Sequence, residues 1–277
     1  MLEIPEAVNI AAQIKESLCG KKVVKAEAAH SPHGFAFYFG DPAGYPALLE
    51  GRVIGDAYPN GGQIEIEAEG MRITFNDGVI PRLYGSGSNV PAKHQLYLEF
   101  DDGGFIICTL QMYGGMMVFP EGANDNYYYL VAKEKPSPLT GAFDEEYFDS
   151  IYKEAKPNVS AKALLATEQR IPGLGNGCLQ DILFTAGINP QTKAPKLSDG
   201  QRADLYKSMK TVLKAMTDGG GRNTEKDLFG NSGGYRTILS SKTVSEPCPK
   251  CGGAIVRKAY MGGNVYFCPA CQPVIKT

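Results

Sequence analysis

The sequence predicts a multidomain α+β protein: an N-terminal helix with an antiparallel β-sandwich, then a helical domain, then a small cysteine-rich hairpin. Three observations predict this fold class. Apolar residues alternate with a period of two from about residue 22 to 120, and the spacing becomes helical beyond residue 141. Two C-x2-C pairs lie within the last thirty residues. A chain of 277 residues can hold two domains and an appendage. We expect them at 1–133, 142–245 and 246–277.

The individual elements follow from local patterns. A first helix is expected over 5–18, because Pro5 suits a first helical turn and Gly20 can end a helix. Seven short strands follow, in "KVVKAEA", "FAFYF", "QIEIEAE", "MRITF", "QLYLEF", "FIICTL" and "MMVF". The segment 134–141, "EKPSPLTG", is typical of a linker. Four helices are expected beyond it, in "DEEYFDSIYKEA", "SAKALLATEQ", "GCLQDILFTAG" and "SDGQRADLYKSMKTVLKAMTDGGG".

Charge is distributed unevenly along the chain. The net charge is −2, yet residues 201–277 hold 12 Lys and Arg against 5 Asp and Glu. This asymmetry favours a polyanionic partner for the C-terminal part, although solvated surface charge alone would also explain it. No apolar run approaches the roughly 18 residues that cross a bilayer, so no membrane segment is expected. The N-terminus carries glutamates where an export signal carries lysines, which favours a cytoplasmic protein.

The cysteine pairs indicate a metal site. Their pattern is C-x2-C-x16-C-x2-C, formed by Cys248, Cys251, Cys268 and Cys271. Four thiolates complete the tetrahedron of a closed, structural zinc site, so we expect one structural Zn²⁺ per chain. A redox C-x2-C normally stands alone near a βαβ unit, which is not visible here. Two disulfides are the other alternative, and the expected reducing compartment disfavours them.

A glycine-rich stretch, "RIPGLGNG", lies between the second and third predicted helices of the C-terminal half. Dinucleotide-binding glycine loops follow a strand, whereas this stretch follows a helix, so that function is excluded. A helix N-terminus after such a turn still presents backbone N–H groups to an anion. A tight turn without any ligand is the alternative.

Taken together, these motifs resemble the formamidopyrimidine-DNA glycosylase / endonuclease VIII family of base-excision repair enzymes. The similarity is strongest in "IPGLGNGCLQDILFTAGINP", in "TDGGGRNTEKDLFG" and in the cysteine hairpin, and "LEIPEAV" resembles the family's opening Pro-Glu-Leu-Pro-Glu-Val. The resemblance implies a β-sandwich, a helix–two-turn–helix domain and a zinc finger, with damaged duplex DNA held between the domains. It also implies a monomer associated with the nucleoid.

The resemblance implies a set of DNA-contacting residues. Asn176 matches an asparagine that contacts a phosphate, Gly175 lies beside it with an available N–H, and Lys162 matches a phosphate-contacting lysine. Such contacts hold DNA without reading its sequence. Further DNA contacts are expected at Gln63, His94 and Tyr235.

The resemblance also implies chemistry at the N-terminus, where the family's proline amine attacks the sugar C1′ and the next residue, a glutamate, acts as general acid/base. Here Leu2 occupies the proline position, while Glu3 and Glu6 are kept. A large second residue blocks methionine removal, so Met1 is expected to remain. Its amine then lies roughly 3.5 Å beyond the usual place, a displacement large enough to lose reactive geometry. A capping role for Glu3 at the first helix is the alternative.

Other family positions differ as well. The phosphate-contacting strand lysine matches Gln63, and the methionine that fills the space of the flipped base matches Asp77. The arginine and phenylalanine that enter the same gap fall near Met112 and Tyr113. The zinc-finger arginine falls at Gly263.

Three hypotheses follow. The protein is a DNA glycosylase with weak or absent lyase activity that uses Glu3, a full glycosylase/lyase that uses the Met1 amine or Lys162, or a catalytically silent protein that binds damaged DNA.

Overall fold

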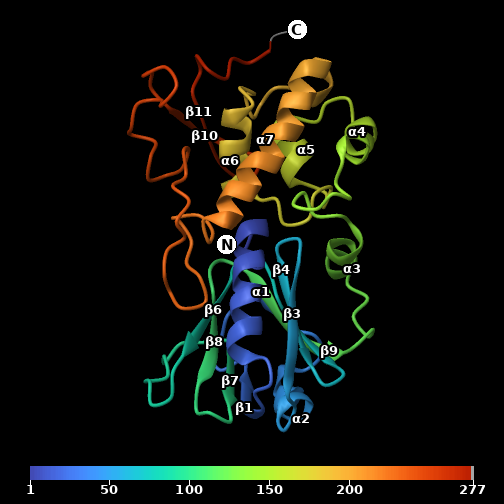
Figure 1. Cartoon of the computed structure of the whole chain (residues 1–277), viewed down its shortest axis with the longest axis vertical. Helices are drawn as coiled ribbons and strands as arrows, with labels where there is room; N and C mark the ends of the chain where they lie inside the picture. The colour runs from blue at the N-terminus through green and yellow to red at the C-terminus, as the bar shows by residue number, and fades with distance from the viewer. Residues whose placement is uncertain (276–277) are drawn as a thin grey trace.

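The computed structural model describes residues 1–275 and shows the expected α+β architecture (Figure 1). Two β-sheets with one long helix form one half of the molecule, and helices with a two-stranded hairpin form the other. Within residues 1–275, no helix combines the length and the apolar character that a membrane crossing requires.

Two sheets make the sandwich. One has the strand order β1-β7-β8-β6 and the other β2-β9-β5-β4-β3. The strands of the first sheet are β1 (Val23–Ala28), β6 (Val79–Tyr84), β7 (Leu96–Phe100) and β8 (Phe105–Leu110). Those of the second are β2 (Ala36–Phe37), β3 (Ile54–Asn60), β4 (Gln63–Ala68), β5 (Met71–Phe75) and β9 (Gly114–Pro120). A 3₁₀ turn (Pro42–Gly44) and the short helix α2 (Tyr45–Leu49) lie between β2 and β3.

Two strands, β3 and β6, were not predicted from the sequence, and the reason is the same for both. β3 contains Pro59 and β6 contains Pro81, and each strand lies at an edge of its sheet. Proline lacks the N–H that a central strand must donate, so it is confined to edges and weakens the strand signal. The strand expected in "FAFYF" is shorter than predicted, and it pairs parallel, not antiparallel, with β9.

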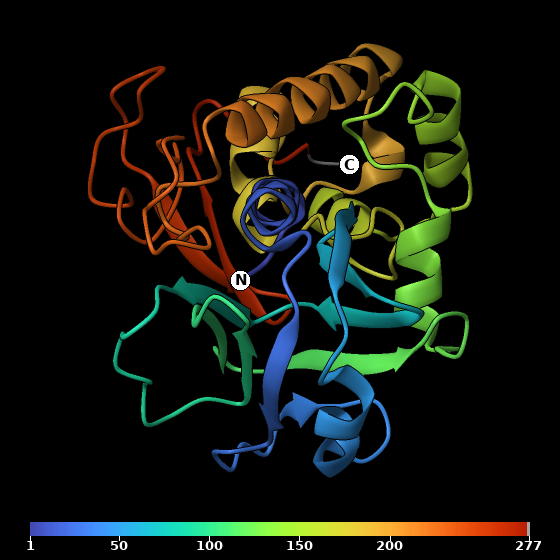
Figure 2. The same cartoon turned by 60° about the horizontal axis from the view of Figure 1, so that its bottom comes forward.

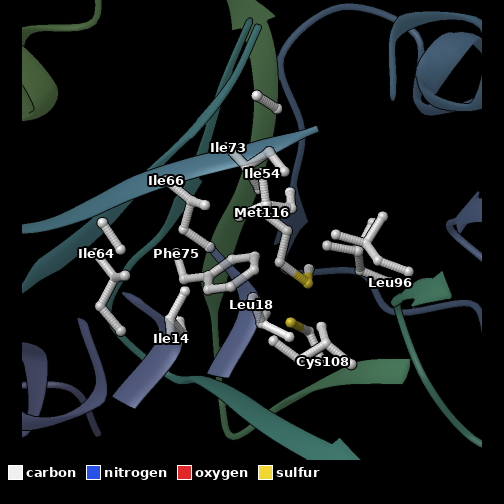
Figure 3. Packing of buried hydrophobic residues seen from close by; sticks show 14 of the residues in the cluster. Ile14, Leu18, Ile54, Ile64, Ile66, Ile73, Phe75, Leu96, Cys108 and Met116 are labelled. Carbon is white, nitrogen blue, oxygen red and sulfur yellow. The ribbon is translucent and has the colours of Figure 1, made fainter. Parts of the chain in front are cut away.

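Helix α1 (Ile4–Leu18) belongs to both halves of the molecule. Ile14 and Leu18 are buried in the sandwich core with Phe75 and Met116, as Figure 3 shows. At the other end of the helix, Ile4 is buried in the core of the helical half. The start of α1 therefore lies where the two halves meet, close to the N-terminus marked in Figures 1 and 2.

The helical half contains the four expected helices, with boundaries shifted by one to three residues. They are α4 (Glu145–Lys153), α5 (Ala161–Ala166), α6 (Asn176–Thr185) and α7 (Asp199–Asp218), with a 3₁₀ turn at Ala194–Lys196. An additional helix, α3 (Tyr127–Glu134), begins at an Asn126 cap and ends where the linker was expected. Its sequence, "YYYLVAKE", is too short and too weakly periodic to reveal a helix.

The C-terminal hairpin pairs β10 (Val256–Tyr260) with β11 (Gly263–Phe267), as the sequence indicated. The hairpin packs against α6, with Gln180 of the helix bonded to the backbone of Asn264 and Tyr266. In Figure 1 it lies beside α6 and α7, on the opposite side from α4.

Candidate functional site

Glu3 lies immediately before α1 at the meeting point of the two halves. The residue is 4% exposed, and it makes no side-chain cap to its own helix. The carboxylate instead accepts hydrogen bonds from the backbone N–H groups of Gly175 (3.0 Å), Gly177 (2.8 Å) and Cys178 (2.8 Å), at the start of α6. The alternative that Glu3 caps the first helix is therefore wrong. The anion at this glycine-rich helix N-terminus is the protein's own glutamate.

This arrangement corrects a second expectation. The N–H of Gly175 is not available to DNA in this structure, because it donates to Glu3. The glycine-rich turn also packs tightly on the sandwich. A Cβ on Gly173 would lie 1.9 Å from the backbone nitrogen of Gly62, in the turn between β3 and β4, so only glycine permits this approach.

Arg222 is a site residue that the sequence did not reveal. Its guanidinium is buried between two carboxylates: Nη1 lies 3.0 Å from Oε1 of Glu3, and Nη2 lies 2.7 Å from Oε2 of Glu6. Nε of Arg222 also donates to Glu6 at 3.0 Å, and Nη2 donates to the carbonyl of Met1 at 3.3 Å. Glu3 and Glu6 of the N-terminal segment are thus held by one buried cation.

Gly177 makes the space that Arg222 occupies. A Cβ at position 177 would lie 1.5 Å from Nη1 of Arg222. The only signal in the sequence for the contact between Gly177 and Arg222 is the glycine itself, because glycine is unfavourable inside a helix and its presence there needs a reason. The partner lies 45 residues away in "GGGRNTEKD", and local periodicity carries no information on such a distant contact.

The environment keeps Glu3 ionised. Burial alone would raise the pKa of this carboxyl, but the Arg222 charge and the N–H groups of Cys178 and Gly177 hold the pKa below its ordinary value. The nearby thiol of Cys178 stays protonated, since burial raises its pKa well above the usual range. Glu3 is therefore a fixed negative charge at neutral pH.

Leu2, which was expected at the position of the family's proline, is a packing residue in this structure. Its side chain is buried in the sandwich core, and its backbone N–H donates to the carbonyl of Asp77 at 2.7 Å. The amino group of Met1 lies 2.6 Å from a carboxylate oxygen of Glu225. With Met1 in place, the side chain of Leu2 packs in the sandwich core, and the amino group of Met1 is held in an ion pair with Glu225.

Lys162 and Asn176 come together at the tip of the C-terminal hairpin. Lys162 is buried, and Nζ donates to the carbonyl of Tyr260 at 2.6 Å, while Nδ2 of Asn176 donates to the carbonyl of Asn264 at 2.9 Å. A Cβ on Gly263 would lie 3.5 Å from Asn176 and 3.7 Å from Lys162. Burial lowers the pKa of Lys162. Helix α5, helix α6 and the hairpin thus build one polar cluster.

The remaining expected DNA contacts do not join that cluster. Nε2 of Gln63 donates to the carbonyl of Tyr128. The hydroxyl of Tyr235 donates to the buried Asp181 at 3.1 Å, which ties it to the interior of the helical half. His94 is 3% exposed and stacks on His30, with ring centroids 4.2 Å apart. The cavity beside His94 shares no lining residue with those around Leu2.

The four cysteines of the hairpin converge. Their sulfurs all lie within 4.8 Å of one another, with 3.8 Å between Cys248 and Cys271 and 3.5 Å between Cys251 and Cys268. A tetrahedral metal with bonds of about 2.3 Å to sulfur separates its ligands by about 3.8 Å, which fits. A disulfide requires about 2.05 Å, so the disulfide alternative is wrong. The cluster can hold a metal ion.

Leu2 lines two cavities. The smaller, about 210 Å³, is lined by charged side chains that include Glu6, Arg82, Glu225 and Lys226. The larger, about 600 Å³, lies between the sandwich, α3 and the glycine-rich turn. Three features of the structure bear on function: the carboxylate of Glu3, the two cavities, and the Lys162–Asn176 cluster.

A family model and full-length relatives both relate this chain to formamidopyrimidine-DNA glycosylases. A family model described as the formamidopyrimidine-DNA glycosylase H2TH domain matches residues 135–227. Formamidopyrimidine-DNA glycosylase of Geotalea daltonii is 29% identical over 98% of this chain and 100% of its own length. The protein of the same name from Symbiobacterium thermophilum is 28% identical, over 99% of this chain and 90% of its own length.

Solved structures show the same fold at lower identity. A complex of Lactococcus lactis Fpg with DNA containing an abasic site superposes with a TM-score of 0.84, at 22% identity over 98% of this chain and 99% of the other. MutM (Fpg) from Thermus thermophilus gives 0.80, at 23% identity over 99% and 100%. With its helix–two-turn–helix domain and its full-length relatives, the chain belongs to the formamidopyrimidine-DNA glycosylase / endonuclease VIII family.

Proposed function

We propose that this protein is a base-excision-repair DNA glycosylase that releases damaged bases. The observation that carries the proposal is Glu3, a buried carboxylate held ionised where the two halves of the molecule meet. Carboxyl groups with perturbed pKa values are common at catalytic sites. The relatives named formamidopyrimidine-DNA glycosylase match this chain over nearly its whole length, which supports the same class of reaction.

Glu3 acts in this proposal as the catalytic residue. A water oxygen forms a bond to the sugar C1′, the bond from C1′ to the base nitrogen breaks with its electron pair leaving on the base, and the proton lost by water passes to Glu3. Before that transfer, the carboxylate stabilises the positive charge that develops on the sugar. Its lowered pKa favours the electrostatic role, because the negative charge is present at every physiological pH.

Lyase chemistry is proposed to be weak. A Schiff base needs an unprotonated amine at C1′. The Met1 amine is paired with Glu225, the side chain of Leu2 is apolar and buried in the sandwich core, and Lys162 is buried against the carbonyl of Tyr260. Each amine is thus engaged by the protein itself, which favours hydrolysis over covalent catalysis.

DNA is proposed to be held by the helical half and the hairpin. Lys162 and Asn176 supply phosphate contacts in this proposal, because Nζ of Lys162 carries three N–H donors and Nδ2 of Asn176 two, and each uses one of them on a hairpin carbonyl within the described residues. The cysteine cluster is proposed to hold one structural Zn²⁺, which stabilises the hairpin and carries no chemistry because four cysteines leave no open position. We expect a monomer that acts at the nucleoid.

A second candidate is a catalytically silent protein that binds damaged DNA. One observation favours it: both oxygens of Glu3 already accept two hydrogen bonds each, so the group performs a complete structural role without substrate.

Base release from a panel of lesion-containing duplexes, with borohydride trapping in parallel, tests these proposals. Release with little trapping supports the proposed function. Efficient trapping would support the bifunctional hypothesis, and tight lesion binding without any release would support the silent one.

A further inference from the structure

Glu27, His30 and His94 form a second group of potential metal ligands, separate from the cysteine cluster. Glu27 lies near the end of β1, His30 in the loop that follows, and His94 just before β7. One ligand atom from each of the three lies within 4.8 Å of the other two. Two imidazoles beside one carboxylate favour divalent ions of the zinc class over Mg²⁺ and Ca²⁺, which prefer oxygen ligands.

His94 is arranged as a metal-binding histidine usually is. The residue is 3% exposed, and Nδ1 lies 2.8 Å from the carbonyl oxygen of Pro91. Because a carbonyl oxygen only accepts, Nδ1 carries the proton and Nε2 holds the lone pair. Nε2 is buried and has no hydrogen-bond partner among the described residues. Metal-bound histidines donate their other N–H to a backbone carbonyl in this way, and a bound ion gives the buried lone pair a partner.

The backbone holds His30 close to His94. The N–H of Ala29 donates to the carbonyl of Gln95 at 2.8 Å. The N–H of Ser31 donates to the carbonyl of His94 at 2.9 Å, and Oγ of Ser31 accepts the N–H of His94 at 3.1 Å. Ala29 has a φ of 58°, a left-handed conformation that is uncommon for a residue with a side chain. The loop is thus fixed on both sides of His30.

A cavity of about 320 Å³ is lined by all three ligand residues and leaves room for an ion. A metal lies in the plane of each imidazole that binds it, whereas the rings of His30 and His94 are stacked within 8° of parallel. His30 must therefore turn to bind, and its side chain is 42% exposed. Glu27 is 41% exposed and lies 2.5 Å from Nδ1 of His30. Lys25 also lines the cavity, with its Nζ over the ring of Tyr97 at 5.5 Å from the centroid.

We propose that Glu27, His30 and His94 bind one exchangeable divalent ion of the zinc class. The ion links the end of β1 to the loop before β7. Three protein ligands leave a position for water, unlike the closed cysteine cluster. Because two of the three ligands are exposed, the ion exchanges with solvent and is lost on desalting. The inference is independent of the proposed function, since that function assigns no role to these three residues.

Calorimetric titration of the purified, desalted full-length protein with Zn²⁺ tests the inference. We expect uptake of one further equivalent of Zn²⁺ and no uptake of Mg²⁺. His30→Ala should weaken this uptake by more than about 100-fold, because losing a group that only orients a histidine ligand already costs about 10–100-fold. Proton NMR gives a second readout. The Cε1–H signals of His30 and His94 should shift with Zn²⁺, and that of His33, the remaining histidine, should not.

His33→Ala is the matched control, because His33 is close in sequence to His30 but outside the ligand group. Glu27→Gln keeps the shape of the third ligand, removes its charge and should also weaken uptake. A thermal melt without added zinc verifies that each variant folds. No saturable further equivalent, equal uptake of Mg²⁺ and Zn²⁺, or equal losses in the His30 and His33 variants would overturn the inference and leave the proposed function standing.

Discussion

Arg222 and Glu3 form a buried ion pair that joins the last third of the chain to its first turn, with 3.0 Å between Nη1 and Oε1. The guanidinium simultaneously bonds Glu6, so one cation faces two carboxylates that are each about 95% buried. The pair fixes the N-terminal segment against α6 and the glycine-rich turn. It determines both the position and the charge of the proposed catalytic group.

Removal of this cation should destabilise the protein. Arg222→Met would leave Glu3 and Glu6 buried without a counter-charge, which costs about 3–5 kcal/mol of the free energy of unfolding at neutral pH. Arg236→Met is the matched control, because Arg236 is 75% exposed and its ion pair with Glu246 contributes at most about 1 kcal/mol. Urea unfolding measures both. Similar losses in the two variants would show that the Arg222 pairs are not the main electrostatic support.

The contribution of Glu3 to stability should depend on pH with a defined sign. Its folded-state pKa is below the ordinary value of about 4.3, so the stabilisation is fully present above that value and disappears as pH falls through the folded-state pKa. The difference in unfolding free energy between the unaltered protein and Glu3→Gln should be constant from pH 7 to about 5.5 and should shrink below about pH 4.5. A difference that grows toward acid pH would mean that Glu3 is protonated in the folded protein.

The cysteine cluster should bind one zinc per chain. Metal analysis of the purified protein should give close to one equivalent, and Cys268→Ser should lose most of it because one corner of the tetrahedron is removed. Cys19→Ser is the control, since Cys19 is an exposed cysteine outside the cluster. Zinc binding supplies folding free energy to so small a unit, so chelation should also weaken DNA binding. Full zinc content in the Cys268 variant would refute the assignment.

Lys162 should anchor DNA without selecting a sequence. Lys162→Ala should weaken binding to different duplexes by a similar factor, and the slope of log K against log salt concentration should fall by about one. Lys214→Ala serves as the control because Lys214 is 71% exposed and paired with Asp218 on α7. Unchanged affinity at low salt in the Lys162 variant would exclude the phosphate contact at this residue.

Much of the fold could be predicted from the sequence, because the signals are local. Period-two alternation revealed the central strands, whereas the edge strands β3 and β6 were hidden by Pro59 and Pro81. The cysteine spacing predicted the cluster, since four ligands in two C-x2-C turns can converge in few ways.

The charge arrangement around Glu3 could not be predicted in the same way. Arg222, Gly177 and Glu3 are distant in sequence, and their contact depends on how α1, α6 and the segment after α7 pack together. The expectation of an open N–H at Gly175 failed for the same reason. A predicted helix N-terminus indicates that an anion can bind there. Which anion binds depends on the tertiary structure, and here it is the carboxylate of Glu3.

The central claim is that the Glu3 carboxylate, and not an amine, removes the base. The most direct measurement is single-turnover base release from a lesion-containing oligonucleotide by the unaltered protein and by Glu3→Gln, with borohydride trapping of each and a thermal melt to verify folding. We predict release by the unaltered protein with little trapping, and a loss of about 10²–10⁴ in rate for the folded Glu3→Gln variant with DNA binding retained. Undiminished release by that variant, or efficient trapping of the unaltered protein through the Met1 amine, would contradict the account.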